Sequence, residues 1–113
     1  MTAITTHVLD TARGRPAAGV AVSLARRTGE TWTQLATART DATGRVGANL
    51  LPDDLENPTG TYRLRFDMGA YFKAQGVASF HPFIEILFDV RDAEHYHVPL
   101  LVSPFGYTTY RGS

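Results

Sequence analysis

The amino-acid sequence predicts an all-β sandwich, and three observations lead to that fold class. Most segments alternate apolar and polar residues with a period of two, which is typical of strands with one buried face. About seven or eight such segments follow one another, separated by turn signals at intervals of roughly ten residues. The chain has 113 residues and neither an internal repeat nor a linker, so we expect a single domain over residues 1–113.

The first half of the chain predicts three strands. They run over residues 4–10, 19–24 and 32–38, and turn-forming segments rich in Gly, Pro, Asp or Thr separate them. The segment 11–16 is expected as a Gly/Pro turn. Residues 41–45 predict another turn, because the aspartate can close an Asx-turn and the glycine can adopt a positive φ.

The second half of the chain predicts further strands and one short helix. The strands keep the period of two and are expected at residues 61–67, 83–90, 96–102 and 107–110. The segment 68–75 has helical character and ends before a glycine, which predicts a helix of about two turns.

Composition excludes several classes of protein. With no cysteine, the chain cannot form a disulfide scaffold, use a catalytic thiolate or build a Cys-based zinc site. Eleven basic residues balance eleven acidic ones, so there is no basic field for nucleic acid. No apolar run approaches the roughly 20 residues of a membrane span, and the N-terminus lacks a signal-peptide pattern. We therefore expect a cytoplasmic protein with neither nucleic-acid nor membrane partners.

Two histidines are expected to point away from the core. The strand at 4–10 places His7 on the face opposite its apolar row, and the strand at 96–102 does the same for His97. Their neighbours on these outer faces include Leu9, His95, Pro99 and Leu101, which a monomer would expose. An apolar outer face that bears histidines suggests a subunit interface.

Spacing alone leaves less specific interpretations open. A histidine on a strand is more often solvated or structurally hydrogen-bonded than catalytic, and an arginine after a turn glycine, such as Arg45, is usually solvated. The last residues of a chain are often frayed, and carboxylates at strand ends usually serve turns. His95 and His97 have a spacing that zinc accepts, with His7 as a third ligand, but this signal is weak.

Four segments of the sequence resemble the transthyretin-like family. They are residues 5–17, 40–45, 95–107 and the terminal tetrapeptide 110–113, and they follow the family's order over the whole chain. The terminal Tyr-Arg-Gly-Ser distinguishes the 5-hydroxyisourate hydrolases of this family from the hormone carrier transthyretin. The resemblance implies a prealbumin-like sandwich of two four-stranded sheets with one short helix. It also implies a homotetramer, a dimer of dimers, with active sites at the dimer–dimer interface.

The resemblance further implies an enzyme of urate breakdown. Such an enzyme opens the cyclic amide of 5-hydroxyisourate to give 2-oxo-4-hydroxy-4-carboxy-5-ureidoimidazoline, and it requires neither a cofactor nor a metal. The family's catalytic positions fall on His7, Arg45 and His97, where the carrier has Lys, Glu and Thr. One histidine would be the general base, while Arg45 would hold the anionic substrate or the developing oxyanion. The substrate pocket would be shaped by Tyr110, Arg111, Gly112 and Ser113.

Three alternatives come from other classes of protein. A non-catalytic protein could bind a small aromatic ligand in the same channel, as transthyretin does. A zinc hydrolase would use His7, His95 and His97 as ligands. A purely structural β-sandwich would assign no role to these side chains.

Overall fold

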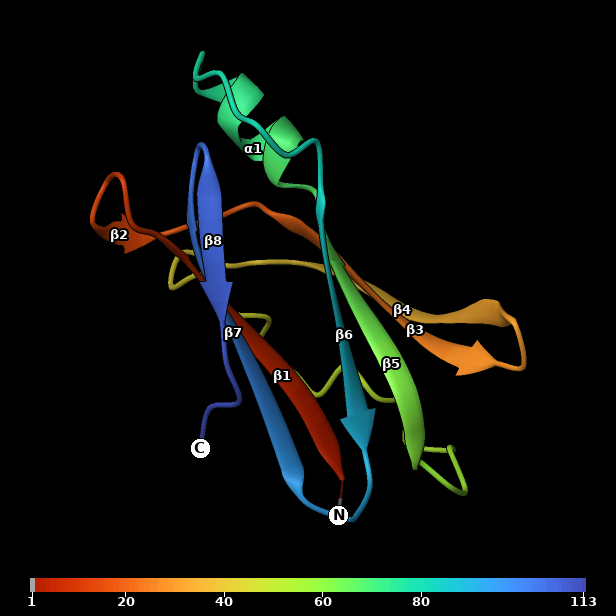
Figure 1. The fold of residues 1–113 in the computed structure, drawn as a ribbon. Helices are drawn as coiled ribbons and strands as arrows, with labels where there is room; N and C mark the ends of the chain where they lie inside the picture. Colours follow the sequence, from red (N-terminus) through yellow and green to blue (C-terminus); the bar gives the residue numbers. More distant parts are fainter. Residues whose placement is uncertain (1) are drawn as a thin grey trace.

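Two four-stranded sheets face each other in a computed structural model that describes residues 2–113 (Figure 1). The first, which we call the β1 sheet, has the order β2-β1-β7-β8, with bounds Arg15–Pro16, Ala3–Asp10, His95–Ser103 and Gly106–Thr109. The second, the β5 sheet, has the order β4-β3-β5-β6, with bounds Thr31–Arg39, Ala21–Thr28, Gly60–Phe66 and Ile84–Val90. This arrangement confirms the expected all-β sandwich of two four-stranded sheets.

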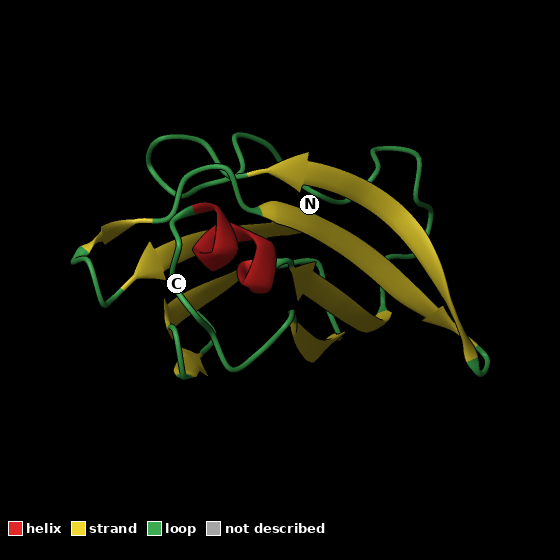
Figure 2. Ribbon diagram, turned by 90° about the horizontal axis from the view of Figure 1, so that it is seen from above, coloured by secondary structure: helices red, strands yellow, loops and turns green. Residues whose placement is uncertain are grey.

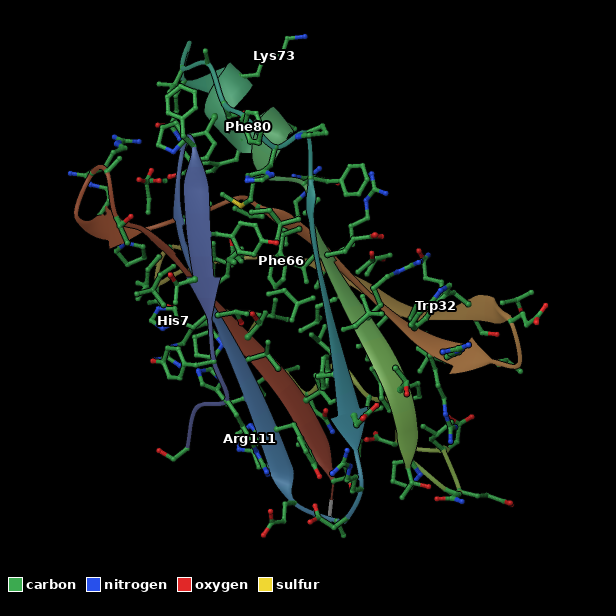
Figure 3. The ribbon with its side chains drawn as sticks, in the orientation of Figure 1. His7, Trp32, Phe66, Lys73, Phe80 and Arg111 are labelled. Atoms are coloured by element: carbon green, nitrogen blue, oxygen red, sulfur yellow. The ribbon has the colours of Figure 1, made fainter. Side chains whose placement is uncertain are left out.

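The core lies between the two sheets and follows the alternation in the sequence. In β1 every second residue is buried, and in β5 Tyr62, Leu64 and Phe66 are fully buried while the arginines between them are half-buried. Figure 3 shows Phe66 between the sheets and His7 on the far side of the β1 sheet. Each large apolar side chain buried in this way contributes about 1.5–3 kcal/mol to folding, so the inner faces fix which residues point outward.

The single short helix, α1 (Met68–Ala74), covers one end of the sandwich. Figure 2, which looks down on that end, shows the helix in front of the strands. Met68 and Phe72 are its buried residues, and the Tyr71 hydroxyl donates a hydrogen bond of 2.8 Å to the buried carboxylate of Asp10 at the end of β1. Within residues 2–113, no helix is long and apolar enough to cross a membrane.

The structure agrees with most of the expected elements and corrects two details. The segment 11–16 is a turn whose last two residues also pair with β1 as the short strand β2, which the Gly/Pro turn signal did not predict. Pro99 was expected on an exposed outer face, but it is buried. The C-terminal segment covers it, because Thr109 donates a hydrogen bond of 2.8 Å to the Pro99 carbonyl and Gly112 lies against the proline ring.

Candidate active site

The strand register places the candidate residues on the outer face of the β1 sheet. Strands β1 and β7 pair in parallel, with Thr5 opposite His97 and His7 opposite Pro99. Neighbouring strands lie about 4.8 Å apart, so side chains on the same face of such a pair are close neighbours. His7 and His97 are both half-buried on this outer face, as their strand positions predicted.

A tight turn brings Arg45 next to His7, along the edge of β1 that is not paired with β7. Asp41 Oδ1 accepts hydrogen bonds from the Thr43 backbone N–H, the Thr43 hydroxyl and the Arg45 backbone N–H, at 2.8, 2.6 and 3.2 Å. These bonds lower the pKa of the exposed Asp41 carboxyl below its ordinary value of 3.8, because they favour the charged form. The turn then pairs with β1 through an antiparallel bridge between His7 and Arg45.

Gly44 allows this turn to lie directly on β1. Its φ of 79° is in the left-handed region, and a Cβ at this position would lie 2.4 Å from the Val8 carbonyl oxygen. No side chain fits at that distance from the backbone. The Gly44 carbonyl also accepts the Val8 backbone N–H at 2.8 Å, so the glycine fixes Arg45 next to His7.

The contact of His7 with the same turn determines where its ring proton lies. His7 Nε2 is 2.8 Å from the Thr43 backbone carbonyl, which can only accept a hydrogen bond. Nε2 therefore carries the proton, and Nδ1 of the neutral ring keeps its lone pair. A ring held in this way can accept a hydrogen bond from water at Nδ1.

His97 is the histidine whose protonation the fold disfavours. Its Nδ1 lies 2.8 Å from the Thr5 hydroxyl on β1. Burial lowers the pKa of His97 below its ordinary value of 6.5, and the neighbouring Arg45, His95 and His7 lower it further, because a protonated His97 would be repelled by positive charge on these groups. The His97 imidazole is therefore neutral near pH 7, which a general base requires.

The terminal tetrapeptide divides between two sides of the β1 sheet. Gly112 lies beside His97: its backbone N–H donates to the His97 carbonyl at 2.8 Å, and a Cβ on Gly112 would lie 2.6 Å from His97 Cδ2. Arg111 instead forms an ion pair of 3.1 Å with Glu94 and places its guanidinium 4.3 Å from the centre of the Tyr96 ring. Ser113 is exposed and follows directly after Gly112.

Tyr110 and Arg111 border a different cavity. This cleft of about 460 Å³ is also lined by Tyr96 and Val98 of β7, whose side chains point inward, and by Ile86 to Asp89 of β6. Tyr110 is 58% exposed there. Within one copy of the chain, the structure thus brings His7, Arg45, His97 and Gly112 together, while Tyr110 and Arg111 lie on the other side of the sheet.

The geometry gives no support to the zinc alternative. Across residues 2–113, no group of three or more His, Asp or Glu side chains is arranged to hold a metal ion. His95 and His97 each direct one ring nitrogen at the hydroxyl of Thr5.

One contributor to the site was missing from the sequence-based set. Thr5 shares the outer face of β1 with His7, two residues apart, but nothing in the sequence set it apart from other strand threonines. Its closeness to His97 depends on the parallel register of β1 and β7. The sequence alone shows only that Thr5 and His7 share a face, and the pairing of β1 with β7 is needed to place Thr5 beside His97.

A transthyretin-type sandwich whose outer sheet face holds two histidines and an arginine defines the class of protein. The chain belongs to the HIUase/Transthyretin family, whose profile matches residues 4–112. It is 50% identical to a 5-hydroxyisourate hydrolase of Caulobacter vibrioides, with complete coverage of both chains.

Solved structures of both branches of this family resemble the chain. A 5-hydroxyisourate hydrolase of Klebsiella pneumoniae superimposes with a TM-score of 0.86 and 38% identity, covering 100% of each chain. Sea bream transthyretin in complex with thyroxine superimposes with a TM-score of 0.88 and 40% identity, covering 96% of this chain and 93% of that one. Because both share the fold, the side chains of the site must decide between hydrolysis and binding.

Proposed function

We propose that the protein is a hydrolase that opens the cyclic amide of 5-hydroxyisourate to give 2-oxo-4-hydroxy-4-carboxy-5-ureidoimidazoline, a step of urate breakdown. The observation that carries this proposal is the placement of His7, Arg45 and His97 on one sheet face of a chain whose relatives are 5-hydroxyisourate hydrolases. These three side chains supply a general base, a partner that orients water and a fixed positive charge. We propose them as the catalytic residues, with no metal involved.

The proposed reaction follows from the protonation states of the two rings. His7 Nδ1 accepts a hydrogen bond from the attacking water, because its Nε2 proton is held by Thr43. His97 removes a proton from that water, whose oxygen bonds to the carbonyl carbon and leaves a negative charge on the carbonyl oxygen. When the C–N bond breaks, the proton held by His97 passes to the leaving nitrogen, and the carbonyl group becomes a carboxylic acid, which releases its remaining proton to bulk water as the carboxylate.

Arg45 is proposed to hold the negative charge that this reaction develops. Its guanidinium has no ion pair or hydrogen bond to a side chain or carbonyl in residues 2–113. Its backbone, in contrast, is held in the turn, because its N–H donates to the Asp41 carboxylate and its carbonyl accepts the Asp41 N–H. A charge without a protein partner is free to bind an anionic substrate or an oxyanion. Removing one such donor typically costs about 10²–10³-fold in kcat.

We further propose that the site is completed in a homotetramer, a dimer of dimers. The β1-sheet face that carries His7 and His97 leaves both rings only half-buried in one copy of the chain, and it also bears the half-buried apolar Leu101. A second copy packed on this face would turn it into an enclosed channel in which Tyr110 to Ser113 can reach the substrate. Light scattering on the purified protein measures this assembly, and a monomer at micromolar concentration would contradict it.

The direct test of the proposed function is the decay of freshly generated 5-hydroxyisourate followed by absorbance. The wild-type protein should accelerate the decay, Arg45→Ala should not, and activity should persist in excess chelator. Arg63→Ala, an arginine on the outer face of the β5 sheet, is the matched control and should retain activity. Decay at the spontaneous rate with the wild-type protein would contradict the hydrolase proposal.

Ligand binding without catalysis is the second candidate, and the similarity to a thyroxine-bound transthyretin favours it. Calorimetry with thyroxine tests it directly. Tight binding together with an unaccelerated decay of 5-hydroxyisourate would establish this candidate in place of the first. The cytoplasmic location expected from the sequence stays a prediction that cell fractionation can test.

A further inference from the structure

The hydroxyl of Thr5 lies between two histidine rings. Its Oγ1 is 2.8 Å from His97 Nδ1 and 2.7 Å from His95 Nε2, and the two ring centres are 6.2 Å apart. The parallel register explains this arrangement, because Thr5 is opposite His97 and diagonal to His95 on one outer face. Thr5 is therefore the one group that contacts both rings through hydrogen bonds within residues 2–113.

The Thr5 hydroxyl has a single proton, so the two hydrogen bonds that link His97, Thr5 and His95 must run in the same direction. If Thr5 donates to His95 Nε2, it can accept a hydrogen bond from His97 Nδ1–H; if it donates to His97, it accepts from His95. The position of the proton on His97 is thus tied to the state of His95. For His97 to direct an unprotonated Nε2 at the water, its own proton must be on Nδ1 and donated to Thr5.

The two rings differ in how well they can carry a positive charge. His97 is half-buried and has Arg45 of the 41–45 turn and His7 of β1 as neighbours, so its protonated form is disfavoured first by burial and then by the positive charge of Arg45. His95 is exposed at the start of β7, where water solvates a cation. On the adjacent tail, Gly112 has no charged side chain, and Arg111 is paired with Glu94.

We propose that Thr5 is a positioning residue that holds the proton of His97 on Nδ1 and couples it to His95, so that the exposed ring takes the charge generated in catalysis. This inference rests on the proposed function, since it assigns His97 as the base. As His97 Nε2 gains a proton from water, the Nδ1 proton moves to Thr5 Oγ1 and the threonine's own proton moves to His95 Nε2. The same steps run backwards when the leaving nitrogen takes the proton from His97 Nε2, and no proton is gained or lost over the cycle.

Substitutions at Thr5 test the coupling through activity. Thr5→Val keeps the branched shape but removes the hydroxyl, so kcat should fall at least about tenfold while KM stays nearly unchanged. This loss is a part of the ~10²–10⁴-fold acceleration that a general base supplies. Thr5→Ser retains the hydroxyl and should recover most of the rate. Thr61→Val on β5, whose hydroxyl donates to Asp89 on the other sheet, is the matched control and should keep wild-type kcat.

The same coupling predicts a lower rate for His95→Gln, because the relay then ends on a group that cannot take up a proton. His81→Gln is the control, since that ring contacts the side chains of Phe80 and Tyr107 and no residue of the site. His95→Gln should also flatten the pH dependence of kcat relative to the wild-type protein. Wild-type kcat and pH profile in both Thr5→Val and His95→Gln would overturn the proposal while leaving the hydrolase function intact.

A measurement independent of activity separates this inference from the proposed function. Nitrogen-15 NMR of the histidine rings reports which ring nitrogen carries the proton. In the wild-type protein at neutral pH, His97 should be protonated on Nδ1. In Thr5→Val it should shift to Nε2, because Nδ1–H would lose its acceptor. A wild-type His97 protonated on Nε2, or a ring unaffected by Thr5→Val, would overturn the coupling even if the enzyme is active.

Discussion

The outer faces of the two sheets both carry arginines, but they use them differently. On the β5 sheet, Arg63 Nε lies 3.3 Å from Glu85 Oε2 and Arg65 Nε lies 3.2 Å from Asp67 Oδ1. Both guanidiniums also lie over aromatic rings, at 4.6 Å from the centre of Trp32 and 3.8 Å from that of Phe83. On the β1 sheet, Arg45 has no side-chain partner of either kind among residues 2–113, while its backbone is held by Asp41 and His7.

This difference separates structural charges from charges available for chemistry. Ion pairs between partly exposed side chains and cation–π contacts contribute about 0.2–1 kcal/mol each, so the β5-sheet arginines add modestly to stability. The neighbouring carboxylates also offset the positive charge that a ligand would meet there. Arg45 adds no such contact, and its charge acts on His97 by disfavouring the imidazolium form. A rigid backbone with an unpaired charged group is the arrangement that electrostatic catalysis requires.

The largest expected effect comes from removing the proposed general base, His97, on the β1-sheet face. His97→Gln should lower kcat by about 10²–10⁴-fold, the usual contribution of a general base, with unfolding temperature nearly unchanged because the side chain is half-buried. Steady-state kinetics and thermal unfolding measure the two quantities. His81→Gln, in the loop before β6, should leave both at wild-type values, and equal losses of kcat in the two variants would show that the effect is not specific to His97.

Arg45→Ala is expected to lower kcat/KM by about 10²–10³-fold without loss of stability, since its guanidinium supports no other side chain. Arg63→Ala should do the reverse: it should retain activity and lose up to about 1 kcal/mol in the free energy of unfolding. Urea unfolding and the substrate-decay assay on both variants provide the comparison. An Arg45→Ala protein that is destabilised as much as Arg63→Ala would show that Arg45 is structural.

A smaller effect is expected where the tail touches the site. Gly112→Ala would place a Cβ 2.6 Å from His97 Cδ2, so the ring or the tail must move. Misplacing a catalytic group by about 1 Å can cost up to ~10²-fold in rate. Gly106→Ala is the matched control, because the nearest atom to its Cβ would be Ser103 Oγ at 3.9 Å. Equal activities for the two variants would show that the tail does not constrain His97.

The sequence predicted which face of a strand each side chain occupies better than it predicted the contacts between neighbouring strands. The period-two alternation placed His7 and His97 outward because the inner row of β7 is apolar and that of β1 contains Ile4 and Val8. Contacts between distant segments could not be read in this way: Thr5 and His97 are 92 residues apart, and their hydrogen bond depends on the register of a parallel pair. The burial of Pro99 likewise depends on the path of the tail, for which the alternation has no signal.

The C-terminal tail shows that the residues of one sequence motif can have different contacts in the structure. The resemblance assigned all of Tyr110 to Ser113 to the pocket, yet within one copy of the chain these four residues have different surroundings: Tyr110 and Arg111 line the cleft beside β6. Gly112 contacts His97, while Arg111 contacts Glu94 and Tyr96. Whether Tyr110 and Arg111 reach the substrate stays a prediction that depends on the assembly of several copies.

The smallest expected effect concerns the pKa of His97, and it tests whether Arg45 acts on that ring. The pKa lies below 6.5, so kcat/KM should fall as the pH drops through the folded-state value, where His97 takes up a proton. The unfolded chain takes up its proton first, near 6.5. The contribution of neutral His97 to stability is therefore complete above pH 6.5 and is lost as the pH falls toward the folded-state pKa.

In Arg45→Ala the pKa of His97 should rise, because one positive charge beside the ring is gone, but it should stay below 6.5 because burial is the larger cause. An NMR titration of the ring measures this shift even where the variant is inactive. Arg63→Ala should leave the His97 pKa unchanged, and high salt should raise it in the wild-type protein by screening the same charge. A His97 pKa that is identical in wild-type and Arg45→Ala proteins would mean that the unpaired arginine is too far from the ring to act with it.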